Sequence, residues 1–356
     1  MQAVMTRSAR RLTLLRLSRF ASSLRPLQPR GKASDSCPTV YVTGFLTDTR
    51  DHENYTDWLG SHQRLSRALG WCEEAHGVEW RTGSDGDLFG KWPLPVHVAV
   101  MMMRRSSPAA FAYGLAGDAI LNAARVFMSF RTAETAAGHD APQLAAALAA
   151  LADAPHVSSY RVVAHSLGCR LVIDALPLLS PERRPAEVHL CAAATTPTHA
   201  MPKLGALCQP GGRLYHHWSA GDEALSSAFL LASGGVPALG SAPLPCIDTA
   251  TAASKATTSA SSHDASAYLG LASHGAFRLH FDRLASDAVL GREPPPPRPW
   301  LAYQQARSAE LLTRALQRLP TVESFTLTQS RASLRVWARA QFDRRRQSAN
   351  VERDRQ

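Results

Sequence analysis

The sequence lacks an apolar run long enough to cross a bilayer as a helix. Its most apolar stretch, residues 95–103, is far shorter than the ~20 residues that a spanning helix needs. The longer segment 111–130 is interrupted by Asp118, Asn122 and Arg125. We therefore expect no transmembrane helix. A chain of 356 residues, of which 45% are hydrophobic, is instead expected to bury one large core.

Closely spaced cysteine pairs are also missing. The six cysteines include no C-x-x-C pair and show no regular spacing. Structural zinc sites and dense disulfide frameworks both depend on such spacing, so neither is expected. The simpler expectation is a protein of a reducing compartment that uses no metal and no cofactor.

Acidic residues are absent from the first 34 residues, which hold eight Lys or Arg and many Ser. This composition is typical of a mitochondrial or plastid transit peptide. The alternative is a basic tail without fixed structure on a cytoplasmic protein that is peripheral to a membrane. Residues 331–356 hold eight Arg and three acids, so the ends carry +8 and +5 of the net +10 and the body carries −3. A mildly acidic body gives no support to nucleic-acid binding, whereas the basic termini are compatible with peripheral membrane contact.

The body alternates between strand-like and helix-like segments. Residues 51–70 have helical spacing, with Asp51 as the N-cap and Gly70 as the stop. Residues 93–153 are rich in Ala and Leu and are expected to form a helical, lid-like insertion, with breaks at 107–108 and 136–142. The expected strands are 39–45, 76–80, 160–166, 187–194, 213–220 and 244–251. This order predicts an α/β fold with a mostly parallel sheet and helices on both faces.

The segment VVAHSLGCRLV (162–172) places Ser166 between an expected strand and an expected helix. Ala164 and Gly168 flank the serine at two residues on either side, as small residues do in a nucleophile elbow. The alternative is an ordinary turn. A serine at the carboxyl end of a parallel strand lies where open α/β sheets bind their ligands, which favours the nucleophile.

A serine nucleophile needs a base and a carboxylate that orients the base. Asp222 follows the strand expected at 213–220, so a short loop can carry it to the same edge of the sheet as Ser166. Glu223 is the neighbouring alternative. Asp174, two turns along the helix that follows Ser166, is a weaker candidate because it points back into the domain.

Three histidines follow the expected acid in the chain. His280 falls inside a helical pattern and is expected to be a packing or surface residue. His263 lies in the Ser/Ala/Thr-rich stretch 249–267, which is expected to be a flexible loop. His274 directly precedes Gly275 and a helix, so a tight turn can hold its ring at the sheet edge. We therefore favour His274 as the base and keep His263 as the alternative.

The oxyanion of an acyl-transfer intermediate needs two N–H donors. The backbone N–H of Leu167, the residue after the nucleophile, is the first expected donor. The second is expected from Phe45 or Leu46, in the turn where Gly44 permits an unusual backbone. The alternative is that Gly44 is an ordinary turn glycine, which would be compatible with the same sequence.

The sequence resembles the α/β-hydrolases similar to transmembrane and coiled-coil domain protein four, a family catalogued as a domain of unknown function. The resemblance covers about residues 38–282 and rests on VYVTGFLTDTRDHENYTDW, AHSLGCRLVIDAL, VHLCAAATTP, GRLYHHWSAGDEAL and FLLASGGVPALGSAPLP. It implies an α/β-hydrolase fold whose triad is Ser166, Asp222 and a downstream histidine. The family's Gly-His motif followed by an aromatic residue takes the form SHGAF here, which supports His274, and Ala164 stands where the family's elbow has Gly.

Three regions are expected from these patterns. They are a basic extension over 1–37, a hydrolase domain over 38–291, and a Pro-rich linker with a basic helical extension over 292–356. The expected activity is that of a serine hydrolase, esterase-like or lipase-like, that cleaves a carboxylic ester or thioester of an apolar, lipid-like acyl substrate. The alternative is an α/β-hydrolase-fold module without catalysis that acts as a binding or membrane-associated scaffold.

Overall fold

The computed structural model of the protein describes residues 23–29, 36–45, 47, 49, 51–82, 108–244, 259–269 and 273–293. Within the helix that begins at Pro108, the side chains are described from residue 129 onward. The basic segment 1–22, most of the strand predicted at 244–251, and the linker and C-terminal extension from residue 294 lie outside these residues.

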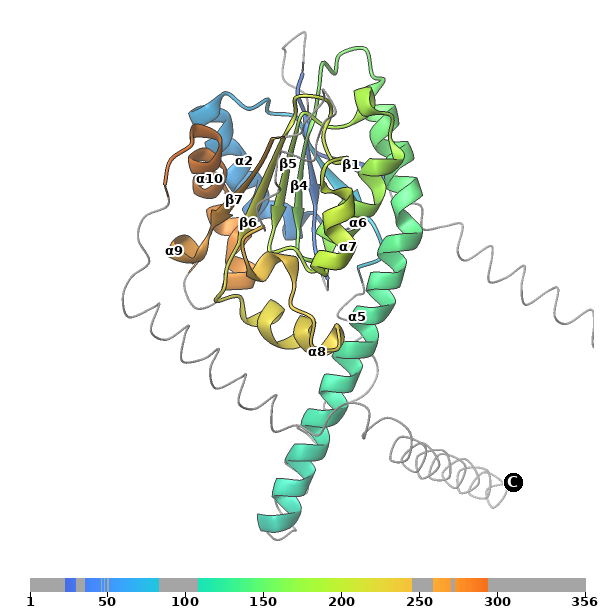
Figure 1. Ribbon diagram of the computed structural model, residues 1–356, viewed down its shortest axis with the longest axis vertical. Helices are drawn as coiled ribbons and strands as arrows, with labels where there is room; N and C mark the ends of the chain where they lie inside the picture. Colours follow the sequence, from blue (N-terminus) through green and yellow to red (C-terminus); the bar gives the residue numbers. More distant parts are fainter. Residues whose placement is uncertain are drawn as a thin grey trace, which may run out of the picture. The chain divides into compact units, whose positions relative to one another are not determined.

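A single seven-stranded sheet forms the centre of the described part, in the order β1-β3-β2-β4-β5-β6-β7 (Figure 1). Neighbouring strands run parallel except for β1, which pairs with β3 in the antiparallel direction. The mostly parallel sheet predicted from the sequence is therefore confirmed. The strands are β1 Ser23–Gln28, β2 Thr39–Val42, β3 Ala75–Glu79, β4 Arg161–His165, β5 Glu187–Cys191, β6 Arg213–Trp218 and β7 Ser259–Asp264.

Helices cover both faces of the sheet, as Figure 1 shows. On one face α2 (Thr56–Leu69) packs against α10 (Ser273–Leu290), and on the other α5 (Pro108–Ala152) packs against α6 (Leu167–Ala175). The shorter helices are η1 His52–Tyr55, η2 Leu176–Leu178, η3 Pro181–Arg183, α7 Pro197–Leu204, η4 Leu225–Phe229, α8 Leu230–Ala232, η5 Leu239–Ser241 and α9 Ser266–Leu269. None of the helices described has both the length and the hydropathy that crossing a bilayer would require.

The first helical region begins and ends where the sequence predicts. The Asp51 side chain accepts a hydrogen bond from the Glu53 N–H at 2.9 Å, which caps η1, and α2 continues the chain from Thr56. Gly70 ends α2 with a φ of 66°, a left-handed conformation that glycine adopts without a Cβ penalty. Trp58 and Leu65 are buried, so they lie on the face of α2 that packs towards the sheet.

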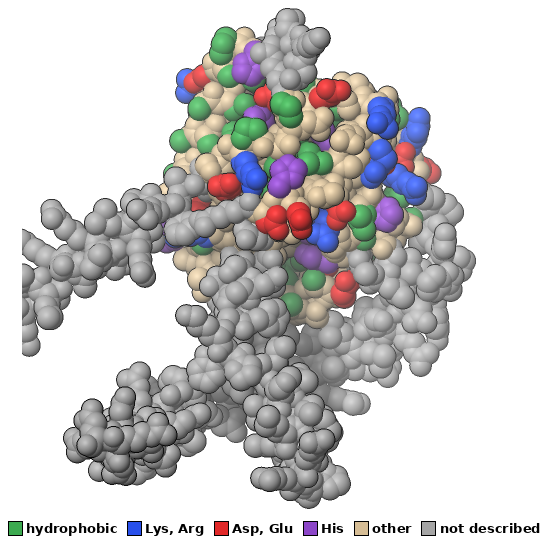
Figure 2. Space-filling view, turned by 180° about the vertical axis from the view of Figure 1, so that it is seen from behind, with side chains coloured by type: hydrophobic (Ala, Val, Ile, Leu, Met, Phe, Trp, Pro, Cys, Tyr) green, Lys and Arg blue, Asp and Glu red, His purple; other side chains and the backbone are tan. Residues whose placement is uncertain are grey.

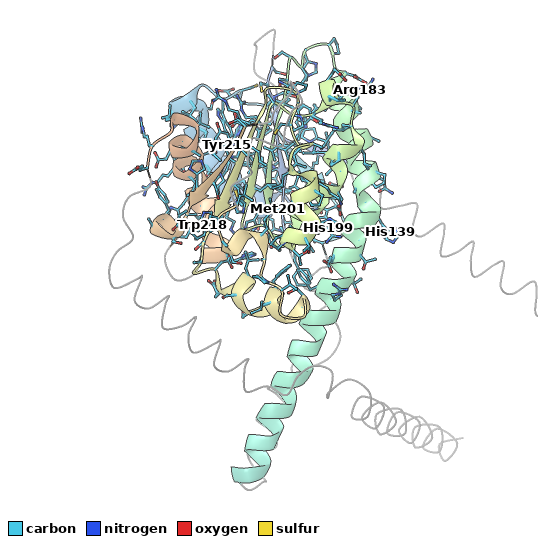
Figure 3. All side chains as sticks on the ribbon, in the orientation of Figure 1. His139, Arg183, His199, Met201, Tyr215 and Trp218 are labelled. Atoms are coloured by element: carbon cyan, nitrogen blue, oxygen red, sulfur yellow. The ribbon has the colours of Figure 1, made fainter. Side chains whose placement is uncertain are left out.

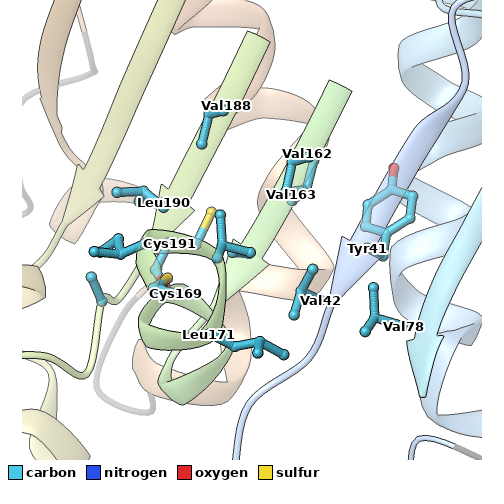
Figure 4. Packing of buried hydrophobic residues seen from close by; sticks show 14 of the residues in the cluster. Tyr41, Val42, Val78, Val162, Val163, Cys169, Leu171, Val188, Leu190 and Cys191 are labelled. Atoms are coloured by element: carbon cyan, nitrogen blue, oxygen red, sulfur yellow. The ribbon is translucent and has the colours of Figure 1, made fainter. Parts of the chain in front are cut away.

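The core between the sheet and α6 fixes the end of β4 where Ser166 follows. Figure 4 shows Val42, Val162 and Leu190 from three adjacent strands beneath Cys169 and Leu171 of α6. All five side chains are buried. Truncating a buried leucine of this kind to alanine typically costs about 2–5 kcal/mol, so this packing holds strand and helix in one arrangement.

The boundary predicted for the N-terminal extension is wrong for residues 23–28. This segment forms the edge strand β1, which pairs with β3 from Ser23 to Gln28 and buries Leu27. Its sequence, SLRPLQ, gives little strand signal because it contains Pro26 and several polar residues. Proline is tolerated in an edge strand, where one side of the backbone needs no sheet partner, and the register shifts directly after it. The folded domain thus begins before residue 38.

The helical character predicted for residues 93–153 is confirmed over Pro108–Ala152, but the break predicted at 136–142 is not present. Helix α5 continues through Pro142, because Leu144 and Leu148 are buried beyond it and Asp140 binds Arg81 from a fully buried position. From residue 129 onward the helix packs against α6 and forms a layer of the α/β body. This part is therefore not a lid. Residues 93–107 lie outside the described residues.

The last strand is also displaced from its predicted place. Leu244 has no regular structure, and the strand β7 is Ser259–Asp264, inside the stretch 249–267 that was predicted to be a flexible loop. Its residues, SASSHD, have low strand propensity. Pairing with β6 over six positions supplies backbone hydrogen bonds that override this local preference.

Candidate active site

Ser166 has the backbone of a strained strand-to-helix turn. Its φ of 54° and ψ of −124° lie in a region that a residue with a side chain rarely adopts. Two hydrogen bonds hold it there: the Ser166 N–H donates to the Cys191 carbonyl at 2.9 Å, and the Ala194 N–H donates to the Ser166 carbonyl at 3.1 Å. The side chain does not cap α6, although Ser166 is its N-cap residue. The strained turn therefore leaves the hydroxyl available for another partner.

Small residues around Ser166 are required by close backbone contacts. A Cβ on Gly168 would lie 2.6 Å from the carbonyl oxygens of Thr43 and Val42, so only glycine fits there. A Cβ on Gly44 would lie 2.6 Å from the Cβ of Ser166. Gly44 does not have a positive φ, so the expectation that it permits an unusual backbone is wrong. Its role is steric, since it lets the turn after β2 touch the serine.

His274 joins Ser166 to Asp222 through hydrogen bonds. His274 Nε2 lies 2.9 Å from Ser166 Oγ, and His274 Nδ1 lies 2.8 Å from Asp222 Oδ2 and 3.1 Å from Oδ1. Because an ionised carboxylate can only accept, Nδ1 carries the proton and Nε2 is left to accept from the serine hydroxyl. This is the geometry of a nucleophile, a general base and an orienting acid.

Asp222 is placed by the turn that follows β6. The carboxylate is fully buried, and its Oδ1 also accepts a hydrogen bond from the Leu225 N–H at 3.0 Å. The neighbouring Glu223 is exposed, so it does not take this position. Asp174 binds Arg170, and His199 of α7, which Figure 3 labels, lies 2.7 Å from it in the same ion cluster. Of the three candidate acids, the structure brings only Asp222 to the histidine.

The three candidate histidines differ in their position relative to Ser166. The glycine that follows His274 predicted a tight turn before the helix. His274 lies instead in the first turn of α10. His263 lies on β7, where Nε2 contacts Ser261 Oγ at 2.9 Å and the ring lies against His217. His280 is further along α10, as its helical pattern predicts. The structure thus brings His274 to Ser166.

The expected oxyanion donors come from two segments that touch. Leu167 begins α6, so its N–H belongs to the first helical turn, where N–H groups have no partner within the helix. Phe45 follows Gly44 directly, and the Trp80 indole N–H fixes this turn by donating to the Thr43 carbonyl at 3.1 Å. Leu46, the alternative to Phe45, lies outside the described residues. Both turns therefore meet beside Ser166.

A further histidine lies beside the site and was not singled out from the sequence. His165, the residue before Ser166, donates from Nε2 to the His274 carbonyl at 2.9 Å, and the two rings are 4.9 Å apart. Burial, reinforced by the nearby His274, lowers the pKa of His165 to about 3, so it stays neutral. The only signal in the sequence was its position next to the serine at the end of a strand.

The surface of the described body carries no large region of one charge on the face drawn in Figure 2. Lys and Arg side chains lie interspersed with Asp and Glu there. This agrees with the mild acidity of the body calculated from the sequence.

Comparison with known proteins gives structural neighbours only. No protein-family model matches the chain, and no curated protein matches it. The solved structure of esterase PE8 is similar at 15% identity over 76% of this chain and 99% of that chain, with a TM-score of 0.36. The Porphyromonas gingivalis dipeptidyl peptidase 4 is similar at 10% identity over 76% of this chain and 36% of that one, with a TM-score of 0.30. The siderophore hydrolase EstB from Aspergillus nidulans follows at 13% identity over 76% and 88%, with a TM-score of 0.28.

The fold is identified from the strand order, the strand directions and the backbone of Ser166 in this chain. The single antiparallel strand β1 at one edge, the parallel order from β3 to β7, and the strained serine between β4 and α6 are the features that define it. With these features the chain has an α/β-hydrolase fold.

Proposed function

We propose that the protein is a serine hydrolase that cleaves a carboxylic ester or thioester. The observation that carries the proposal is the continuous hydrogen-bonded line from Asp222 through His274 to Ser166, with contacts of 2.8 and 2.9 Å. The strained backbone of Ser166 adds to it, because a non-glycine residue keeps such a conformation only where the surroundings enforce it.

In the proposed reaction Ser166 Oγ attacks the carbonyl carbon of the substrate while its proton passes to His274 Nε2. Asp222 stabilises the imidazolium that forms and keeps Nδ1 protonated. The N–H groups of Leu167 and Phe45 are the proposed donors to the oxyanion. His274 then gives its proton to the leaving alcohol or thiol, and water attacks the acyl-enzyme by the same route in reverse.

An apolar acyl group is the proposed substrate component. Three aromatic rings extend from the turn beside Ser166: Phe45 contacts Phe130 of α5 at 5.5 Å, and Phe130 contacts Phe229 of η4 at 5.7 Å between centroids. Both contacts are edge-to-face, with interplanar angles of 81° and 90°. Phe130 and Phe229 are buried in the core and Phe45 is only partly buried, so an apolar ring lies at the turn next to Ser166 and favours a hydrocarbon chain over a charged or sugar-like group.

Kinship with the α/β-hydrolases similar to transmembrane and coiled-coil domain protein four is part of the proposal. The segments that carry the resemblance include Gly44, Ser166 and Asp222, which are three of the residues that meet at the site. The resemblance therefore includes residues of the proposed site and not only residues of the core.

A fluorophosphonate probe tests the nucleophile directly, because it reacts only with an activated serine. We expect labelling of the wild type and loss of labelling in Ser166→Ala. His274→Ala should reduce labelling and hydrolysis of p-nitrophenyl esters by orders of magnitude, since the hydroxyl loses its base. His263→Ala is the matched control, a histidine on β7 whose contacts are with Ser261 and His217, and should keep both.

The outcomes separate the two functions considered from the sequence. Absence of labelling in a folded wild type would favour a binding or scaffold module. Loss of labelling in His263→Ala together with full labelling of His274→Ala would move the base to the other histidine. A series of p-nitrophenyl esters of increasing chain length then measures the preference for an apolar acyl group.

A further inference from the structure

We infer that His165 is a positioning residue for the proposed general base, holding the backbone and one face of His274 in register with Ser166. The inference rests on the proposed serine hydrolase function. It concerns the residue before the nucleophile, which the hydrogen-bonded line from acid to serine does not include.

Two contacts join the two histidines. His165 Nε2 donates to the carbonyl oxygen of His274 at 2.9 Å, and the ring centroids are 4.9 Å apart with the planes tilted by 45°. Asp222 fixes the Nδ1 side of the His274 ring, whereas His165 fixes the peptide group from which the ring projects. The ring is therefore held through its Nδ1 and through its backbone, which leaves Nε2 directed at Ser166.

His165 is covalently linked to the proposed nucleophile, so its contact with His274 also bears on the position of Ser166. His165 and Ser166 are consecutive residues at the end of β4, so a movement of this strand carries both of them together. His274 belongs to α10, a helix that lies more than 100 residues further along the chain. The bond from His165 thus ties the helix that carries the base to the strand that carries the nucleophile, and the distance from Nε2 to Oγ is fixed on one rigid frame.

The surroundings keep His165 in the form that can do this. Trp58 of α2 and Phe277 of α10 lie against its ring, at 5.9 and 6.0 Å between centroids. The environment keeps the ring neutral, as the lowered pKa indicates, so Nε2 carries one proton for the His274 carbonyl. A neutral donor also adds no repulsion when His274 becomes positively charged during turnover.

The test compares two replacements of His165 in the full chain. His165→Gln retains an N–H donor near the position of Nε2, while His165→Phe keeps a ring of similar size and removes the donor. We expect His165→Phe to lower kcat by about 100-fold with KM changed less than about threefold, because a misplacement of ~1 Å in a catalytic group costs about this much. His165→Gln should recover kcat to within about tenfold of the wild type.

His62→Phe is the control for a general loosening of the core. His62 is also a buried ring on this side of the sheet, where it accepts from the Tyr41 hydroxyl at 2.9 Å, and it makes no contact with the proposed triad in the described structure. It should lower the melting temperature without lowering kcat. A purely structural role of His165 would instead give losses of kcat that follow the melting temperatures of the Phe and Gln variants and do not depend on whether an N–H donor is present.

Several results would overturn the inference. They are a wild-type kcat in a folded His165→Phe, equal kcat values in the two His165 variants, or a loss in His62→Phe that matches His165→Phe. Failure of the proposed function has a different signature, since the wild type itself would then show no esterase activity and no labelling of Ser166.

Discussion

Replacing Gly44 with alanine should separate activity from folding. The added Cβ would lie 2.6 Å from the Cβ of Ser166 and 3.1 Å from its hydroxyl oxygen, whereas real Cβ contacts almost never fall below 3.0 Å. Either the serine or the turn after β2 must move, by at least about 0.4 Å and by about 1 Å for an ordinary contact. Ser166 is held by hydrogen bonds to Cys191 and Ala194, so the turn should move.

The expected magnitude follows from what the turn carries. It places the proposed donor Phe45 beside Ser166, and loss of one oxyanion donor typically lowers kcat by about 100-fold to 1,000-fold. Overpacking by one methyl group costs about 1–3 kcal/mol of folding stability, which leaves a domain of ordinary stability folded. Gly44→Ala should therefore lose about two to three orders of magnitude in ester hydrolysis while keeping a cooperative melting transition.

Two other glycines make the experiment decisive. Gly138 of α5 has nothing within 4 Å of an added Cβ, so Gly138→Ala should keep full activity and gain about 0.5–1 kcal/mol. Gly168→Ala would place its Cβ 2.6 Å from two backbone oxygens and should damage folding itself. Turnover and circular dichroism melting are measured on all three. A stable Gly44→Ala with wild-type turnover would refute the argument that the close contact between Gly44 and Ser166 positions the turn that carries the proposed oxyanion donor.

Three further predictions use other parts of the structure. Asp222→Asn should fold and lose about 10⁴-fold in turnover, because the amide cannot hold the Nδ1-protonated tautomer, and near wild-type turnover would remove Asp222 from the triad. Deletion of residues 1–29 should lower the melting temperature well below that of a chain lacking only residues 1–22, because the longer deletion removes β1; equal melting temperatures would contradict the place of β1 in the fold. Burial lowers the pKa of His165 to about 3, that of His216 to about 4 and that of His217 well below its usual 6.5, so the unfolded chain binds about three more protons than the folded chain below about pH 6.5. The contribution of these histidines to stability should be constant above that pH and fall by about 4 kcal/mol per pH unit towards pH 4, and a urea midpoint unchanged from pH 7 to pH 5 would contradict this.

Local sequence patterns were sufficient for the parts of the site that depend on neighbours in the chain. A β-branched strand, then a serine flanked by Ala164 and Gly168, then a helical pattern predicts the elbow, because its steric demands act within a few residues. The loop after β6 predicts Asp222 for a similar reason, since the carboxyl end of a parallel strand has a fixed place in the sheet.

Patterns failed where strand formation depended on a distant partner. SLRPLQ and SASSHD have weak strand propensity, yet each forms an edge strand because β3 and β6 offer unpaired backbone groups to them. Helix α5 passes Pro142 for a comparable reason, since burial of the residues on both sides outweighs the lost hydrogen bond.

The sequence by itself determined the central strands β2 to β6 with the helices α2 and α6, the elbow at Ser166 and the short choice of acids and bases, because these follow from periodicity and turn chemistry. Only the tertiary structure showed that His274, and not His263, lies beside Ser166, gave Gly44 its steric role and revealed the contact of His165 with His274. Each of these depends on a contact between β4 or β2 and a segment far away in the chain. Such contacts are set by how the sheet and α10 pack together, and packing of that kind leaves no periodic signal in the amino-acid order.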